Sequence, residues 1–331
     1  MTKKITLAHG AGGKFSADLI QEIILPEFDN EFLNELHDGA KLGKLAMTTD
    51  SYVVRPIFFA GGDIGKLSVC GTVNDLAVTG AIPKFLAAAV IIEEGFDFDD
   101  LEKIVRSMSA AAKEAGVKIV TGDTKVVGKD QADGIFINTA GIGELIDGVN
   151  ISAKNVRAGM KILISGTVGD HATTILSARH GLEIPETLKS DCAPLNKMIF
   201  EMLEVEKNIA MLRDATRGGV AAVLNEIASA ANVGILLEGE KIPVREEVRG
   251  VCDILGFDFL ELANEGKIIA IVPKNSAEKV LEVMKKNPYG KNSEIIGEVT
   301  ENFVGKVGLK TKIGGVRIVD MPVGNLVPRI C

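Results

Sequence analysis

The chain ends on a thiol, and the segment before it could serve as a tether for that thiol. Residues 321–331 read M-P-V-G-N-L-V-P-R-I-C, so the last residue is Cys331. Prolines and a glycine argue against a helix or a central strand here, while the apolar residues argue against a purely disordered tail. Starting from a hinge at Gly314 and Gly315, an extended tail could span roughly 55–60 Å. We interpret Cys331 as a carrier; the alternative is a frayed chain end without function.

Three carboxylates in the first half could bind a divalent cation. Asp50 ends a predicted strand, Asp75 lies in an apolar helical stretch, and Asp123 stands in a glycine-bounded segment. Asn74 adds a neutral oxygen next to Asp75. Oxygen ligands of this kind suit Mg²⁺ that bridges to phosphates. Each aspartate could instead form a turn or cap a helix, and spacing alone does not decide between these roles.

Two further side chains are candidates for proton transfer or charge stabilisation. Lys125 follows Asp123 by two residues, so both side chains would point the same way from an extended segment. A lysine there could neutralise a transferring phosphoryl group, or act as a base if desolvation lowered its pKa. Glu265 stands just before a predicted buried strand and is a candidate base. The alternatives are a solvated surface lysine and a turn residue.

Two glycine-rich runs could bind phosphate. Gly12-Gly13-Lys14 precedes an amphipathic stretch, and its spacing is not that of a Walker A loop, so it is either a phosphate-binding loop or simply a mobile one. Arg217-Gly218-Gly219 opens an apolar helical stretch. Free N–H groups and the helix dipole favour an anion at such a position.

The elements that must position these residues alternate between strands and helices in both halves. This order predicts an α/β or α+β protein rather than a helix bundle. We expect strands at 45–51, 85–92, 117–120, 135–144, 161–165, 235–238, 267–272, 295–299 and 303–309. We expect helices at 66–79, 101–115, 172–179, 195–206, 220–231, 244–255 and 276–285.

Length and composition limit the possible functions. The 331 residues suggest two domains, and 46% hydrophobic residues support a substantial core. The net charge of −8 argues against nucleic acid as the main partner. No apolar run reaches the ~20 residues of a membrane span, and there is no signal-peptide core. The four scattered cysteines form no zinc motif, and we expect free thiols in the cytoplasm.

Several segments together resemble the HypE family of hydrogenase maturation factors. They are H-G-A-G-G-K, T-T-D-S, G-T-V-N-D-L-A, T-G-D-T-K-V-V, R-D-A-T-R-G-G, A-N-E-G-K and the terminal P-R-I-C. The internal motifs also fit the wider superfamily of aminoimidazole ribonucleotide synthetase-like (PurM-like) ATP-using enzymes. The terminal motif narrows the resemblance to HypE.

This resemblance implies a two-domain PurM-like α/β fold that forms a homodimer through its first-domain sheets. It implies an N-terminal loop and helix (1–40), an ATP, Mg²⁺ and dimerisation domain (41–151), a second domain (152–313), and a mobile tail (314–331). It also implies that a HypF-type carbamoyltransferase loads the terminal thiol. The chain would then dehydrate the thiocarboxamide to a thiocyanate with ATP, and cyanide would pass to iron on a HypC–HypD complex for [NiFe] hydrogenase.

The resemblance assigns a role to each candidate residue. The predicted carrier is Cys331, with Lys125 and Glu265 as the proton-transfer or charge-stabilising groups. The predicted magnesium ligands are Asp50, Asp75 and Asp123. The predicted nucleotide contacts are Gly12, Gly13, Lys14, Asn74, Thr124, Arg217, Gly218 and Gly219.

The sequence is also compatible with two other functions. A selenophosphate synthetase belongs to the same superfamily, but it uses a reactive cysteine or selenocysteine near its N-terminus, whereas the first cysteine here is Cys70. A non-catalytic ATP-binding scaffold could use the apolar tail for docking. Loss of one water at Cys331 on incubation with ATP would distinguish the dehydratase from both.

Overall fold

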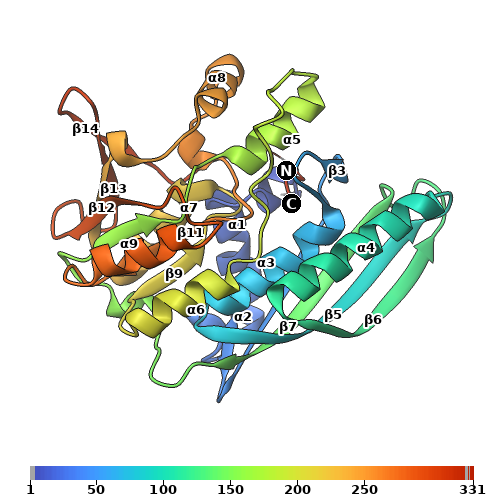
Figure 1. The fold of residues 1–331 in the computed structure, drawn as a ribbon, viewed down its shortest axis with the longest axis horizontal. Coiled ribbons are helices and arrows are strands. Elements are labelled where there is room, and N and C mark those ends of the chain that lie inside the picture. Colours follow the sequence, from blue (N-terminus) through green and yellow to red (C-terminus); the bar gives the residue numbers. More distant parts are fainter. Residues whose placement is uncertain (1–3, 325–326, 328) are drawn as a thin grey trace.

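Two mixed β-sheets with their covering helices form the framework of the computed structural model, which describes residues 4–324, 327 and 329–331 (Figure 1). The helices are α1 Lys14–Leu19, α2 Leu25–Phe28, α3 Ile64–Val78, α4 Phe98–Ala115, α5 Asp170–His180, α6 Asn196–Val205, α7 Gly219–Ala231, α8 Glu246–Leu255 and α9 Ala277–Lys286. The strands are β1 Ala40–Leu42, β2 Leu45–Tyr52, β3 Phe58–Phe59, β4 Gly62–Asp63, β5 Ala81–Glu93, β6 Lys118–Val127, β7 Ile135–Leu145, β8 Lys161–Ile164, β9 Met211–Asp214, β10 Gly234–Glu238, β11 Ile268–Val272, β12 Glu294–Thr300, β13 Val307–Lys310 and β14 Val316–Val319.

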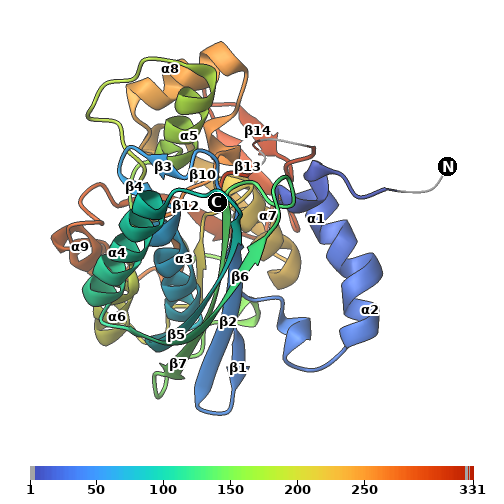
Figure 2. The same ribbon diagram turned by 90° about the vertical axis from the view of Figure 1, so that its right-hand side faces the viewer.

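The first sheet has the order β1-β2-β7-β5-β6, and α3 and α4 lie against one of its faces (Figure 2). Neighbouring strands are antiparallel except β5 and β6, which are parallel and joined by α4. In β2 the side chains alternate between buried and exposed along the strand. This period of two shows that one face is packed against helices and the other is not.

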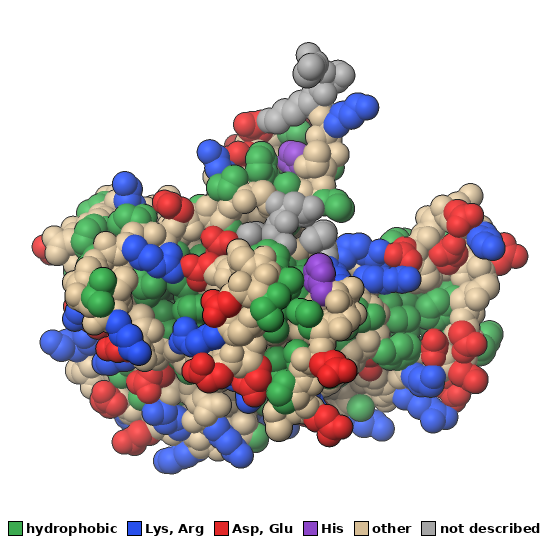
Figure 3. Space-filling model, turned by 90° about the horizontal axis from the view of Figure 1, so that it is seen from above, with side chains coloured by type: hydrophobic (Ala, Val, Ile, Leu, Met, Phe, Trp, Pro, Cys, Tyr) green, Lys and Arg blue, Asp and Glu red, His purple; other side chains and the backbone are tan. Residues whose placement is uncertain are grey.

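The other face of this sheet carries exposed apolar side chains. Met47 of β2, Ile142 of β7 and Phe85 of β5 are paired in register, so they form a row across three strands. Each is 41–46% exposed. In the view from above, hydrophobic side chains also gather on the right-hand lobe, which α4 and strands β5–β7 form (Figure 3). Such a contiguous apolar face is typical of a surface that another protein covers.

The second sheet has seven strands in the order β14-β13-β10-β12-β8-β11-β9. Helices α6 and α9 pack together beside it, and α7 contacts β10 and β13. Strand β11, which lies between β8 and the edge strand β9, is buried along its whole length, which matches the continuous apolar run expected of a strand packed on both faces. None of the helices in the described part of the chain has both the length and the apolar character to cross a bilayer.

The two halves share packing at the C-terminal end of α3. Ala77 and Val78 of this helix belong to the hydrophobic core of the second half. Asn74 links the halves as well, because its amide donates to the Ala193 carbonyl (3.1 Å) and accepts from the Leu195 N–H (2.7 Å). The halves are therefore held together along the helix that carries Asp75.

The end of the chain differs from the predicted tail. Residues 316–319, placed in that tail, form β14, which pairs antiparallel with β13. Beyond β14 the chain returns to the first half, where Val327, Ile330 and Cys331 are buried in its hydrophobic core. In two perpendicular views the C-terminus lies near the middle of the molecule (Figures 1 and 2).

Candidate active site

Four carboxylates from both halves converge beside α3. The cluster consists of Asp50 of β2, Asp75 of α3, Asp38, which precedes β1, and Asp214, at the end of β9. Besides burial, the charge of Asp50 raises the pKa values of Asp38, Asp75 and Asp214, and the charge of Asp38 adds to the shifts of Asp75 and Asp214. Asp50 and Asp75 are two of the three carboxylates that sequence analysis predicted as magnesium ligands, whereas Asp38 and Asp214 were missed. Asp214 lies in the R-D-A-T-R-G-G motif, so a signal for it was present.

Close packing of α3 on β2 brings Asp75 into this cluster. Gly71 lies against the Tyr52 side chain, and a Cβ at Gly71 would be 2.2 Å from the Tyr52 hydroxyl oxygen. Asp75 is four residues further on, so it lies on the same side of the helix. Its carboxylate accepts a hydrogen bond from the Thr48 hydroxyl (3.0 Å). The glycine thus sets the helix–strand distance that places Asp75 near Asp50.

Burial and mutual repulsion make the carboxylates hard to ionise. Burial raises the pKa of Asp38 to about 6, although Arg213, whose Nε lies 2.7 Å from the Asp38 carboxylate, opposes the shift. Burial also raises the pKa values of Asp75 and Asp214, and the repulsion between their charges adds to the effect. A bound cation would relieve this cost.

The donor set fits a magnesium ion that also binds nucleotide. No three His, Cys, Asp or Glu side chains within the described residues form a complete metal cage. Mg²⁺ commonly takes only one or two carboxylates from a protein, the rest of its ligands being waters and phosphate oxygens. Oδ2 of Asp38 is buried and has no hydrogen-bond partner among the described residues. An acidic, oxygen-only cluster of this kind is suited to that partial coordination.

The terminal thiol lies next to this cluster. Cys331 is 8% exposed, and burial raises the pKa of its thiol, with the nearby carboxylates Glu265 and Asp50 adding to the shift. Arg217 opposes it, and a charged thiolate would in turn raise the pKa of Arg217. The thiol is therefore neutral at neutral pH, between a cation and a carboxyl group.

Glu265 is the carboxyl group whose charge does most to raise the pKa of the Cys331 thiol, after the effect of burial. It is 3% exposed, and its Oε1 has no hydrogen-bond partner within the described part of the chain. Burial raises its pKa well above the usual value, and nearby thiol and carboxyl groups add to the shift. Its backbone is fixed by Asp191, which accepts the Glu265 N–H and pairs with Lys267 at 3.0 Å. Sequence analysis missed this buried ion pair.

The two glycine-rich runs and the tail come together near the thiol. The Arg217 guanidinium donates to the Gly10 carbonyl (3.2 Å), and the Lys14 N–H donates to the Pro322 carbonyl (3.0 Å). Gly12 and Gly13 allow this approach, since a Cβ on either would lie within 3.0 Å of Arg217 or Pro322 backbone atoms. The two predicted phosphate-binding runs thus lie side by side. Gly218 and Gly219 have φ values of +78° and +62°, a region that glycine tolerates best.

A single chain does not bring Asp123 and Lys125 to this site. The two form an exposed ion pair of 2.6 Å on β6. They are in register with Ala89 and Ile91, so they share the uncovered face of the sheet, whereas Asp50 points to the helix-covered face. Three strand spacings separate β2 from β6, roughly 14 Å.

Two predicted nucleotide contacts also lie away from the cluster. Thr124 is exposed on β6. Asn74 is 2% exposed, and both ends of its amide bind the segment around Ala193 and Leu195. The structure therefore gives Asn74 a place in the packing between the halves.

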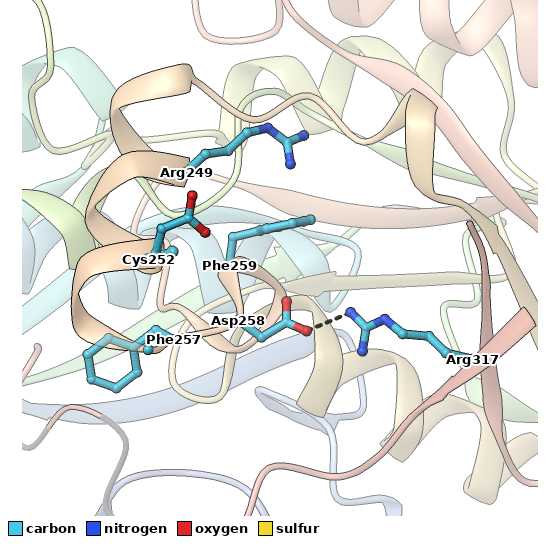
Figure 4. A pocket seen from close by; sticks show the side chains of 8 residues that line it. Arg249, Cys252, Phe257, Asp258, Phe259 and Arg317 are labelled. Carbon is cyan, nitrogen blue, oxygen red and sulfur yellow. Dashed lines mark hydrogen bonds and ion pairs between the residues drawn. The ribbon is translucent and has the colours of Figure 1, made fainter. Parts of the chain in front are cut away.

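A separate pocket of about 450 Å³ opens between α8 and β14 (Figure 4). Arg317 pairs with Asp258 across it (2.6 Å), and the Arg249 guanidinium lies 5.0 Å from the centre of the Phe259 ring. None of the predicted site residues lines this pocket. It is therefore distinct from the acidic cluster and the thiol.

The two-domain fold is that of the AIR synthase related proteins. Residues 34–145 match the family model "AIR synthase related protein, N-terminal domain", and residues 157–310 match the C-terminal domain. These matches cover most of both sheets. The fold class predicted from the motifs is confirmed.

More specific similarity comes from relatives along the whole chain. The carbamoyl dehydratase HypE of Cupriavidus necator is 47% identical, over 99% of this chain and 95% of that protein. A solved HypE–HypF complex matches with a TM-score of 0.89 and 54% identity, over 92% of this chain and 99% of that one. A solved hydrogenase maturation protein HypE in complex with ATP matches with a TM-score of 0.84 and 48% identity, over 99% and 100%. The chain belongs to the HypE family of carbamoyl dehydratases, which serve hydrogenase maturation.

Proposed function

We propose that the chain carries a carbamoyl group on Cys331 and dehydrates it with ATP to a thiocyanate, the source of a cyanide ligand for [NiFe] hydrogenase iron. The observation that carries this proposal is the position of the terminal thiol, buried beside Arg217, Glu265 and the acidic cluster. ATP as the second substrate is supported by the similar HypE structure that contains it.

The reaction needs activation of a poor leaving group. The thiocarboxamide oxygen attacks the γ-phosphate of ATP, ADP leaves, and the oxygen becomes part of a phosphate ester. Loss of phosphate and of both N–H protons then leaves a carbon–nitrogen triple bond, so thiocarboxamide and ATP give thiocyanate, ADP, phosphate and a proton. Arg217 lies where it can stabilise negative charge during this transfer.

Glu265 is suited to accept a proton from nitrogen. Its buried carboxyl has a raised pKa, which makes its ionised form a stronger base than an exposed glutamate. Asp50 and Asp75, together with Asp38 and Asp214, would hold Mg²⁺ against the nucleotide phosphates. The ion would supply charge neutralisation at those phosphates. Lys14 and the Gly12–Gly13 loop, which lie beside the Arg217 run, would close over the nucleotide.

A homodimer would complete the site. The exposed row of apolar side chains at Met47, Ile142 and Phe85 gives the first sheet a face that a second copy could cover. Asp123 and Lys125 are on this same face, so a second chain could receive them at its own nucleotide site. We therefore keep Asp123 and Lys125 as functional residues that act across the dimer. Thr124 lies between them on the other face of β6, in register with Val90, and stays a predicted nucleotide contact.

Loading and unloading require partners that reach the same thiol. A HypF-type carbamoyltransferase would load Cys331, in agreement with the solved HypE–HypF complex, and a HypC–HypD complex would receive the cyanide. Because the thiol is buried when docked, the tail must leave its site for both steps. A free thiol carrier also requires a reducing compartment, which supports the predicted cytoplasmic location.

The test is the mass of the C-terminal peptide after carbamoylated protein is incubated with Mg²⁺ and ATP. We expect loss of one water at Cys331, and a much slower loss in Glu265→Gln, which keeps the shape and removes the base. ATP hydrolysis without any change at Cys331 would favour the scaffold or the selenophosphate synthetase. The latter is also disfavoured by Cys70, which is fully buried inside α3.

A further inference from the structure

The last three residues of the chain are held by a specific set of contacts from the first and second halves. The Val53 N–H donates to the backbone oxygen of Cys331 (2.9 Å), and the Arg329 guanidinium donates back to the Val53 carbonyl (2.8 Å). The Arg55 N–H donates to the Arg329 carbonyl (3.3 Å). Residues 329–331 therefore pair with residues 53–55, which directly follow the strand that carries Asp50.

A buried histidine fixes the residue before the thiol. His171 of α5 is completely buried, and its Nε2 lies 2.7 Å from the Ile330 carbonyl oxygen. A carbonyl only accepts, so Nε2 carries the hydrogen. The other ring nitrogen, Nδ1, lies 2.8 Å from the Ser190 hydroxyl, which can donate to it. The Phe59 ring lies nearly perpendicular to the imidazole ring, with 5.4 Å between the two ring centres. The orientation of the imidazole is therefore constrained both by its hydrogen bonds and by this contact.

The side chain of Arg329 is fixed as well. Asp133, in the loop between β6 and β7, pairs with the guanidinium groups of both Arg329 and Arg55. The Arg329 guanidinium also lies 5.7 Å from the centre of the Phe136 ring. Both the backbone and the side chain of this tail residue are therefore recognised, although a simple tether would need neither.

We propose that His171 and Asp133 form a tail latch that positions the Cys331 thiol beside Arg217 and Glu265. His171 fixes the position of Ile330, and therefore how deeply the C-terminus is buried. Asp133 holds the tail through its ion pair with Arg329. Both are positioning residues, since neither has to touch the reacting group. This inference rests on the proposed function for its meaning, but the docking itself can be measured without ATP, substrate or partner.

The latch also separates loading from dehydration. A closed latch buries the thiol in its neutral form, which is a poor nucleophile towards a carbamoyl donor. An open latch frees the thiol for a partner but removes it from Arg217 and Glu265. Weakening the latch should therefore leave loading intact or faster while slowing dehydration, whereas general damage to the fold would slow both.

The experiment measures alkylation of Cys331 by iodoacetamide in the full-length protein, with peptide mass spectrometry separating Cys331 from the other cysteines. We expect His171→Leu and Asp133→Asn each to raise the alkylation rate roughly 2- to 12-fold, the change that one net hydrogen bond gives. His171→Gln, which can still donate to the Ile330 carbonyl, should lie closer to wild type. Asp130→Asn, in the same loop, should have no effect, because Asp130 does not contact Arg329.

A second readout compares single-turnover dehydration with carbamoyl loading in the same variants. We expect dehydration to slow in both variants while loading does not. Alkylation at the wild-type rate in both His171→Leu and Asp133→Asn would overturn the latch, whatever the chemistry at Cys331. If the variants are alkylated faster but even the wild-type protein shows no dehydration, the latch stands and the proposed function is refuted.

Melting temperatures identify a variant that is simply unfolded. If His171→Leu unfolds, Asp133→Asn still provides the test, because Asp133 lies on a surface loop.

Discussion

At the scale of single residues, burial controls the chemistry of the terminal thiol. A thiol exposed on a mobile tail would have an ordinary pKa and would be open to oxidation and alkylation. In the docked position burial raises the pKa of Cys331, so the thiol stays neutral despite the nearby Arg217. The reactive form of the carrier therefore exists mainly when the tail is undocked.

This difference predicts a pH dependence of docking. A free cysteine has a pKa of about 8.5, and the docked Cys331 has a higher one. Below pH 8.5 both forms are neutral and docking is unaffected. Above it only the undocked thiol loses its proton, so docking should weaken by up to about tenfold per pH unit until the docked pKa is reached.

Trypsin cleavage after Arg329 measures this effect, because the Arg329–Ile330 bond is accessible only when the tail is undocked. We expect cleavage of the metal-free protein, normalised to a model peptide, to rise between pH 8 and 9.5. Cys331→Ser cannot titrate in this range and should remain flat. Parallel curves for the two proteins would show that the thiol is not buried as described.

At the scale of helices and strands, periodicity predicted most of the framework. The long strand β5 and helices α3, α4 and α7 were confirmed because apolar runs and helix signals were clear there. Asp97 caps α4, accepting from the Asp99 and Asp100 N–H groups. The short strands β9 and β14 were missed, since four residues are too few to show a period.

The candidate site was predicted only in part, because its assembly depends on sheet order. The structure brings together Asp50 and Asp75, two of the three predicted magnesium ligands, yet nothing local shows that β7 and β5 separate β2 from β6. The pairing pattern places Asp123 and Lys125 on the opposite face. Docking of the tail was equally hidden, since it depends on Val53 and His171, which are far away in sequence.

Packing of α3 on β2 leads to a prediction with a matched control. Gly71→Ala should destabilise the protein by about 1–3 kcal/mol, because its Cβ would be 2.2 Å from the hydroxyl oxygen of the buried Tyr52. Gly250→Ala, in α8, meets nothing within 4 Å and should instead stabilise by roughly 0.5–1 kcal/mol, the helix preference of alanine over glycine. Chemical denaturation measures both, and equal signs would contradict the described packing.

At the scale of the whole molecule, the proposed homodimer would explain both the uncovered sheet face and the distant Lys125. A second copy packed on that face would bury the exposed apolar row and could receive Asp123 and Lys125 beside its own acidic cluster. The division between chains then explains why one chain contains all the predicted residues but does not bring them together. It also predicts that two different defective chains can complement each other.

Mixed dimers test this division. Lys125→Ala and Asp75→Asn should each abolish dehydration when alone. If Lys125 acts on the other chain, a mixed dimer contains one site with both defects and one intact site, so a random mixture should regain about a quarter of the wild-type activity. Mixing Lys125→Ala with Cys331→Ala, loaded on the intact thiol, provides a second pair. Absence of recovery in exchanging dimers would place Lys125 within its own chain's site, or outside the mechanism.

The most direct measurement follows the oxygen atom of the carbamoyl group. Protein loaded at Cys331 with ¹⁸O-labelled carbamoyl is incubated with Mg²⁺ and unlabelled ATP, and the products are analysed by mass spectrometry. If the carbonyl oxygen is phosphorylated beside the acidic cluster, one ¹⁸O atom appears in inorganic phosphate for each thiocyanate formed. Label released into water, or retained on Cys331 while ATP is hydrolysed, would contradict the proposed dehydration.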